Sequence, residues 1–145
     1  MKNRLADFRG FTLIEVMVVV VILSILAAIV VPRLTGRADE ARITKAEVDI
    51  RNIEAAIELF QLDSGLYPST EQGIEALVAM PSTGEIPRNW KKGGYLKKMP
   101  FDPWGNPYLY LSPGEHGTFD IYSLGADNEL GGEGKDADIG NWRLQ

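Results

Sequence analysis

The sequence contains no cysteine and only one histidine, His116. Disulfide bonds, thiolate nucleophiles and cysteine-ligated zinc or iron–sulfur centres are therefore excluded. A single histidine excludes metal sites built from several histidines and argues against a histidine-based catalytic triad. The chain also lacks a glycine-rich phosphate loop that leads into a helix. We therefore expect no catalytic residues and predict that the protein is not an enzyme.

The chain has no excess of basic residues either, because its formal net charge is −5. Nucleic-acid binding is driven by clustered lysine and arginine side chains that release counterions from phosphates, so we expect no nucleic-acid partner. Charge is missing altogether between Val16 and Val31, where Ser24 is the only polar residue. Because this stretch holds most of the apolar excess, the composition does not fit a simple soluble enzyme.

The apolar stretch follows a short basic segment in which Lys2, Arg4 and Arg9 outnumber Asp7. Lysine and arginine mark the cytoplasmic end of a membrane span. The stretch 11–31 is about as long as the roughly 20 residues that a helix needs to cross a bilayer. No small-residue cleavage site of the ordinary secretory type ends the stretch. We expect a membrane-spanning helix whose amino-terminal end lies in the cytoplasm.

Glu15 is the only charged residue within the membrane-spanning stretch. A carboxylate inside a bilayer costs on the order of 2 to 3 kcal/mol, so it needs water, a partner or a function. Two interpretations follow from its position. Glu15 either lies near enough to the cytoplasmic interface to stay hydrated, or pairs with a cation from another copy of the chain.

The segment Arg9-Gly10-Phe11-Thr12-Leu13-Ile14-Glu15 resembles the class III signal of type IV pilins and pseudopilins. This resemblance implies that a prepilin peptidase cleaves between Gly10 and Phe11 and methylates the new amino group of Phe11. It also implies that Glu15 neutralises the terminal amine of a neighbouring subunit and so sets the register of assembly. Removal of the leader would change the net charge from −5 to −7.

The residues after the membrane span predict a second helical part. Pro32 and Gly36 predict a kink or a loosened turn. Beyond them, apolar residues recur at alternating spacings of three and four, which predicts one buried helix face. These residues are Ile43, Ala46, Ile50, Ile53, Ile57 and Phe60. Glu47 and Arg51 predict an ion pair on the exposed face. The helix is expected to end at Asp63-Ser64-Gly65.

The remainder of the chain predicts short elements. A helix is expected from Thr70 to Met80, with Ser69 or Thr70 as its cap and with Ile74, Leu77 and Val78 facing inward. Residues 81–94 are expected to form a loop, followed by strands over 107–111 and 118–123 joined by a hairpin loop. The prediction is an α+β fold, in which half of a long helix spans the membrane and half packs on a small antiparallel sheet.

Two downstream motifs narrow the family. Asp102-Pro103-Trp104-Gly105 with Tyr108 resembles the DPWG-x-x-Y element of the major pseudopilin of type II secretion systems. Tyr67-Pro68 followed by Thr70-Glu71-Gln72-Gly73 matches the same family. The resemblance implies a pilin-like chain with a cleaved leader at 1–10, a transmembrane and assembly helix at 11–32 and a periplasmic domain at 33–145.

An acidic, glycine-rich loop is expected between Gly125 and Trp142, near the carboxyl terminus. From Glu115 to Asp138 there are seven acidic residues and one basic residue, together with several glycines. Such a segment cannot form a hydrophobic core, and its carboxylates repel one another when they are brought together. It is either a solvated mobile loop or a Ca²⁺ site, since Ca²⁺ prefers six to eight carboxylate and carbonyl oxygens.

The resemblance favours calcium, because type II secretion major pseudopilins bind one Ca²⁺ in this loop. It implies that the carbonyl of Leu124 and the carboxylates of Asp127 and Asp138 are ligands. A further oxygen comes from Asp136 or from a carbonyl near Lys135. Many type IV pilins close the corresponding loop with a disulfide. The absence of cysteine therefore makes an ion the more credible closure here.

The resemblance implies a structural subunit that polymerises into the periplasmic pseudopilus and drives the export of folded proteins across the outer membrane. The implied partners are further copies of the chain, minor pseudopilins, the inner-membrane assembly platform and prepilin peptidase. The implied location is the inner membrane, crossed once, with the carboxyl-terminal domain in the periplasm. The alternative is a type IV major pilin of a surface pilus.

Overall fold

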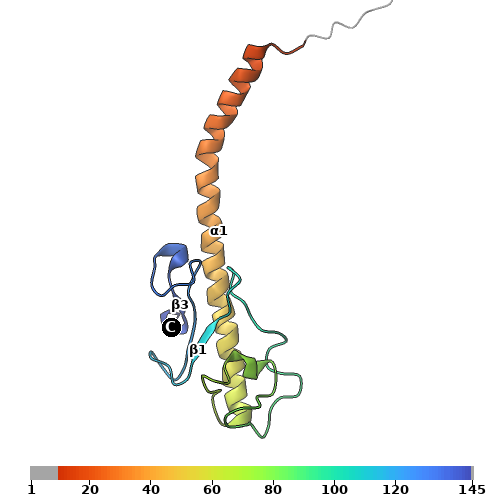
Figure 1. Ribbon diagram of the computed structural model, residues 1–145, viewed down its shortest axis with the longest axis vertical. Helices are drawn as coiled ribbons and strands as arrows, with labels where there is room; N and C mark the ends of the chain where they lie inside the picture. The colour runs from red at the N-terminus through yellow and green to blue at the C-terminus, as the bar shows by residue number, and fades with distance from the viewer. Residues whose placement is uncertain (1–9, 145) are drawn as a thin grey trace, which may run out of the picture. The chain divides into compact units, whose positions relative to one another are not determined.

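The computed structural model describes residues 10–144, with the backbone alone for residues 31–35. A long helix, α1 (Leu13–Ser64), runs through two compact units, of which the first ends at Ala38 and the second begins at Asp39 (Figure 1). Except for Gly10, the predicted leader lies outside the described residues. All of the buried hydrophobic core belongs to the second unit.

The first part of α1 is apolar and long enough to cross a membrane over Leu13–Val30, and none of that stretch is buried within the chain. The hydroxyl of Ser24 donates to the Val20 carbonyl at 2.7 Å, so the one polar side chain between Val16 and Val30 is satisfied within the helix. The loosened turn predicted at Pro32 and Gly36 is wrong, because the backbone remains helical through both residues. Proline removes only one backbone hydrogen-bond donor, and the helix continues on both sides of it.

The second part of α1 carries the predicted buried face. Ala46, Ile50, Ile53, Ile57 and Phe60 are all buried, and Ile43 packs against them at the edge of the core. The helix ends at Ser64, where Gly65 takes a φ of +80° and its N–H donates to the Gln61 carbonyl at 2.7 Å. This confirms the predicted face and the predicted closing glycine.

The predicted ion pair of Glu47 with Arg51 is wrong. Instead, Arg51 Nη2 donates to the carbonyl of Leu144 at 3.5 Å. The ion pairs on this part of the helix join Arg42 to Asp39 and Lys45 to Asp49. An exposed ion pair of this kind contributes little stability, so Arg51 loses little by contacting Leu144 and not Glu47.

The helix predicted from Thr70 to Met80 is shorter than expected. A turn over residues 70–73 precedes a single 3₁₀ turn, η1 (Ile74–Leu77). Ser69 and Gln72 each accept the other's backbone N–H, at 3.2 and 3.0 Å, so Ser69 caps this turn, whereas η1 follows Gly73 without a side-chain cap. Gly73 then takes a φ of +59°, which breaks the helical path before the apolar residues begin. Ile74 and Leu77 are buried as predicted, whereas Val78 is half-buried.

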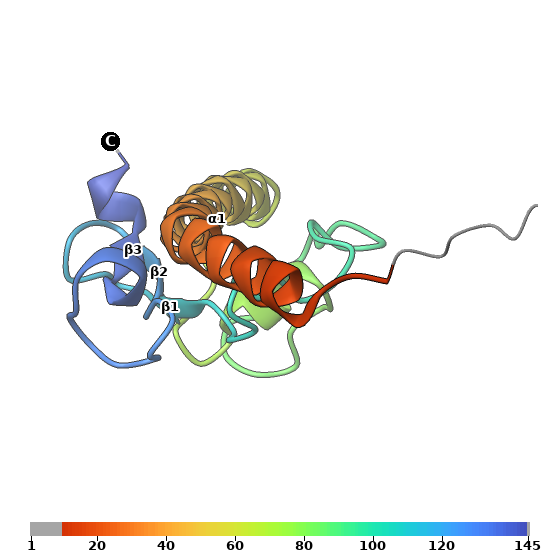
Figure 2. The same ribbon diagram turned by 90° about the horizontal axis from the view of Figure 1, so that it is seen from above.

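A small antiparallel sheet packs on the second part of α1. Its strands are β1 (Leu109–Leu111), β2 (Asp120–Ser123) and β3 (Ile139–Gly140), in the order β1-β2-β3. Figure 1 labels β1 and β3 beside that part of α1, and Figure 2 labels all three strands on one side of the helix. The two predicted strands pair as a hairpin, whereas β3 was not predicted, because a strand of two residues carries no alternation pattern. The predicted α+β architecture is confirmed.

Candidate assembly and metal-binding sites

The first turn of α1 holds Glu15 through its neighbour Thr12. The Thr12 backbone N–H and hydroxyl both donate to Glu15 Oε2, at 2.8 and 2.9 Å, and the Glu15 N–H donates back to the Thr12 hydroxyl at 3.3 Å. This is a reciprocal capping box, a T-x-x-E pattern that the sequence already carried. The carboxylate is therefore fixed at the start of the helix.

Apolar side chains surround the Glu15 carboxylate. Phe11, Ile14, Val18 and Val19 line a hollow with Glu15, and all of them are exposed. Within the described residues, Glu15 has no ion-pair partner. An exposed apolar face of this length requires cover from lipid or from other helices, and its one charge requires either water or a partner of opposite charge.

The acidic loop holds its predicted carboxylates apart. Asp127 Oδ1 accepts the Glu129 N–H at 3.1 Å, and Asp138 Oδ2 accepts the Gly131 N–H at 3.0 Å. Asp136 Oδ1 accepts from Lys135 Nζ at 2.7 Å, and this hydrogen bond is the main reason that the pKa of Lys135 is raised. Among the described residues, no three acidic or histidine side chains form a cluster able to hold a metal.

The backbone of the loop nevertheless closes tightly on itself. The Ala126 N–H donates to the Lys135 carbonyl at 2.9 Å, and the Asp138 N–H donates to the Gly131 carbonyl at 3.2 Å. Gly125 has a φ of +70°, and a Cβ there would lie 2.9 Å from the Lys135 carbonyl oxygen and 3.0 Å from that of Ala137. Gly125 therefore lies against residues 135–137, with the carbonyl oxygens of Lys135 and Ala137 both facing it.

One oxygen of this loop lacks any partner. Asp138 Oδ1 is buried and accepts no hydrogen bond, although buried polar atoms are almost always satisfied. Carboxylate and carbonyl oxygens are the ligands that a hard cation such as Ca²⁺ prefers. The loop therefore fits a hard cation in donor chemistry, with Asp138 as the clearest ligand. Asp136 is engaged by Lys135, so the structure itself does not place its carboxylate beside that of Asp138.

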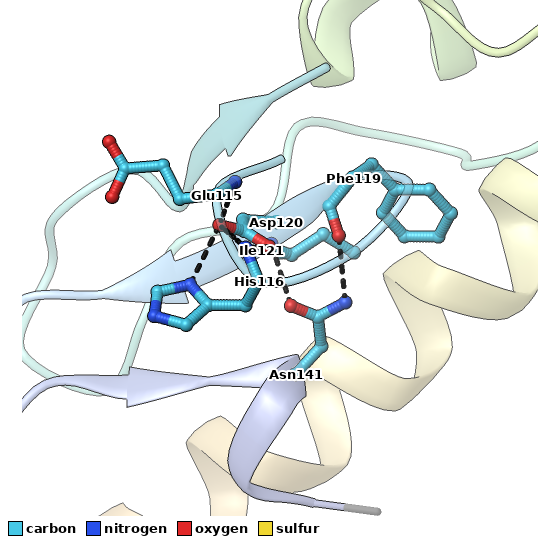
Figure 3. A network of polar contacts seen from close by, with 6 residues as sticks. All are labelled: Glu115, His116, Phe119, Asp120, Ile121 and Asn141. Atoms are coloured by element: carbon cyan, nitrogen blue, oxygen red, sulfur yellow. Dashed lines mark hydrogen bonds and ion pairs between the residues drawn. The ribbon is translucent and has the colours of Figure 1, made fainter. Parts of the chain in front are cut away.

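A polar network ties the hairpin loop to the carboxyl-terminal segment (Figure 3). The buried Asp120 carboxylate accepts the Glu115 N–H at 2.8 Å and faces His116 Nδ1 at 2.9 Å. The buried Asn141 side chain accepts the Ile121 N–H at 3.1 Å and donates to the Phe119 carbonyl at 3.2 Å. The His116 ring also stacks on Trp142 with centroids 4.0 Å apart. His116 therefore contributes to packing and hydrogen bonding in this network. The roles of Asp120 and Asn141 were not predicted from the sequence.

Replacing Asn141 by alanine should lower the free energy of unfolding by about 2 kcal/mol, because two buried backbone groups would lose their partners. Urea unfolding of the purified protein checks this value. Asn106→Ala is the matched control, since the Asn106 side chain forms no hydrogen bond within the described residues. Equal stabilities of the two variants would contradict the role assigned to Asn141.

Comparison with known families separates the chain into two matching regions. Residues 5–31 match the model of the prokaryotic N-terminal methylation motif, and residues 33–142 match the model of type II secretion system (T2SS) protein G. The chain belongs to the T2SS protein G family. The recognition made from Gly10, Phe11 and the DPWG motif is thereby confirmed.

Named relatives of this protein G chain match it along nearly its full length. Type II secretion system core protein G of Pseudomonas aeruginosa is 62% identical over 133 residues, which cover 92% of this chain and 94% of the relative. The core protein G of Vibrio cholerae is 57% identical, with coverages of 94% and 92%. The crystal structure of the major pseudopilin of enterohaemorrhagic Escherichia coli matches with a TM-score of 0.70 and 40% identity, covering 77% of this chain and 92% of that one.

Proposed function

We propose that this protein G chain is the structural subunit of the pseudopilus of a type II secretion system. The observation that carries the proposal is the union, in one chain, of a methylation motif at the start of an apolar spanning helix with a protein G domain. The likeness to a major pseudopilin supports it. The protein G match favours this function over a type IV major pilin of a surface pilus.

The arrangement of apolar surface explains how such a subunit assembles. The large hydrophobic side chains of Phe11–Val30 are exposed, so the helix is stable in a bilayer before assembly and among neighbouring helices afterwards. Contacts between unlike surfaces that do not close a ring generate an open helical filament. Copies of this chain therefore form the periplasmic filament that assists export of folded proteins across the outer membrane.

We infer that the unassembled protein crosses the inner membrane once, with its carboxyl-terminal domain in the periplasm. The position of the basic residues before the span supports this orientation. Prepilin peptidase acts between Gly10 and Phe11, and the minor pseudopilins and the inner-membrane assembly platform are the further partners. The chain serves as a structural component and not as an enzyme.

Mass spectrometry of the assembled protein tests the maturation step. The mature chain should begin at Phe11 and carry one methyl group on its amino nitrogen, because the motif that matches the methylation family spans this residue. Protein from cells without prepilin peptidase is the control and should retain Met1. Assembled protein that still carries the leader would contradict the assignment.

We also propose that the acidic loop binds one Ca²⁺ through the carbonyl of Leu124 and the carboxylates of Asp127 and Asp138, with Asp136 or a carbonyl near Lys135 completing the site. The unpartnered buried Asp138 Oδ1 supports this proposal. So does the approach of Gly125 to the carbonyls of residues 135 and 137. The bound ion would offset the mutual repulsion of the carboxylates and draw Asp127 and Asp136 from their present hydrogen bonds.

Calcium should raise the melting temperature of the soluble fragment that begins at Arg33, which contains the whole buried core. An ion present at about 100 times its dissociation constant stabilises the folded state by about 2.7 kcal/mol, which corresponds to a shift on the order of 10 °C. Chelator should reverse the shift. Asp127→Ala and Asp138→Asn should reduce it, whereas Glu133→Ala, a matched change of an exposed carboxylate, should not. An unchanged melting temperature would overturn the site.

A further inference from the structure

The buried carboxylate of Asp102 joins the DPWG turn to the end of β2. Its Oδ1 accepts the backbone N–H groups of Trp104 and Asn106, at 3.0 and 2.8 Å. Its Oδ2 accepts the hydroxyl of Ser123 at 2.6 Å. Ser123 is fully buried as the last residue of β2, so this hydrogen bond is shielded from bulk solvent. A hydrogen bond to a carboxylate is among the stronger kinds in proteins.

The same hydroxyl reaches the acidic loop. Ser123 Oγ accepts the Gly125 N–H at 3.2 Å, across the peptide that links Leu124 to Gly125. The single proton of the hydroxyl is donated to Asp102, so the oxygen presents only lone pairs to Gly125. Successive hydrogen bonds of this kind polarise one another. Asp102, Ser123 and Gly125 therefore form one directed chain from the core to the first residue of the loop.

This chain fixes the direction of a carbonyl. In a planar trans peptide, the N–H and the C=O point to opposite sides. Because the Gly125 N–H points at Ser123, the Leu124 carbonyl must point away from the buried hydroxyl. A backbone carbonyl that serves as a metal ligand has no side-chain torsions with which to adjust, so its direction depends entirely on how its peptide is held.

We propose that Asp102 and Ser123 are positioning residues for the calcium loop, which act by orienting the Leu124 carbonyl toward the ion. This inference rests on the calcium site proposed above. It gives the DPWG motif a role beyond forming a turn, because its first residue supplies the acceptor that orients the hydroxyl. Neither side chain contacts the ion in this scheme.

Calcium affinity of the full-length protein in detergent, measured by titration calorimetry, tests the proposal. Ser123→Ala should raise the dissociation constant for Ca²⁺ at least about tenfold, the effect usual for residues that orient metal ligands. Asp102→Asn should act in the same direction, because Oδ1 can still bind the turn while the new amide cannot accept from Ser123. Ser64→Ala is the matched control, since that hydroxyl also donates one hydrogen bond and accepts another, donating to the Phe60 carbonyl and accepting from the Leu66 N–H, far from the loop in sequence.

A purely structural role predicts a different result. The melting temperature of Ser123→Ala would then fall equally with calcium and with chelator, as we expect for Ser64→Ala, and the dissociation constant would stay that of the wild type. That result would overturn the positioning role and leave the calcium site standing. A wild-type protein without any calcium response would overturn the site and this inference together, while methylation of Phe11 and filament assembly would still test the pseudopilus function independently.

Discussion

Replacement of Glu15 by leucine should leave the protein in the membrane and abolish ordered filament assembly. The substitution makes the spanning segment fully apolar, so insertion becomes more favourable. In an assembled filament, however, the methylated amine of Phe11 would lose its proposed counter-charge. Removing one partner of a buried ion pair costs about 3 to 5 kcal/mol, which corresponds to a loss of a hundredfold or more in association at each contact.

A second variant separates the charge of Glu15 from its capping role. Glu15→Gln keeps an oxygen that can accept from the Thr12 N–H and hydroxyl, so the first turn of α1 is preserved. Both variants should fractionate with the membrane, and both should lack filaments in electron micrographs and fail to support secretion. Normal filaments from Glu15→Gln would show that the carboxylate serves only as a cap and would refute the ion pair.

Replacement of Phe60 by alanine should remove about 3 to 5 kcal/mol from the free energy of unfolding of the fragment that begins at Arg33. Phe60 is only 1% exposed, and its ring lies 5.4 Å from that of Tyr95, so the variant leaves a cavity between α1 and the loop that covers it. Single domains have a total stability of about 5 to 15 kcal/mol, so much of the stability would be lost.

Denaturant unfolding with Leu62→Ala as the control tests this expectation. Leu62 lies two residues away on the same helix but is 74% exposed, so its loss should change stability by less than about 0.5 kcal/mol. Comparable losses for Phe60→Ala and Leu62→Ala would mean that the predicted face of α1 is not the one that packs on the domain.

The long helix and its buried face were predictable because helical periodicity is a local property of the sequence. Ile50, Ile57 and Phe60 recur on one face, and all three are buried. The end of α1 was predictable for the same reason, since Gly65 is the residue that can close a helix in the left-handed region. The predicted length of the helix between Thr70 and Met80 was wrong. The positive φ of Gly73 interrupts the helical backbone there, although the apolar residues around it have helical spacing.

The proposed assembly site rests on residues that are adjacent in the sequence, and the structure adds the local geometry of Glu15. Gly10, Phe11 and Glu15 follow from a contiguous motif, which needs no tertiary information. The capping box of Thr12 with Glu15 is encoded in the same residues, because Thr12 and Glu15 form a T-x-x-E pattern at the start of the helix. Whether the carboxylate also pairs with a second copy remains a prediction.

The sequence by itself determined the methylation motif, the apolar stretch of α1, the family and the packing face of α1, because each depends on hydrophobicity and on residues close along the chain. Only the tertiary structure decided which buried polar groups meet. Asp102 reaches Ser123 across 21 residues of sequence, and Asn141 reaches Ile121 across 20. Such pairs leave no periodic signal, since any buried polar group accepts whichever partner the fold brings within hydrogen-bond distance.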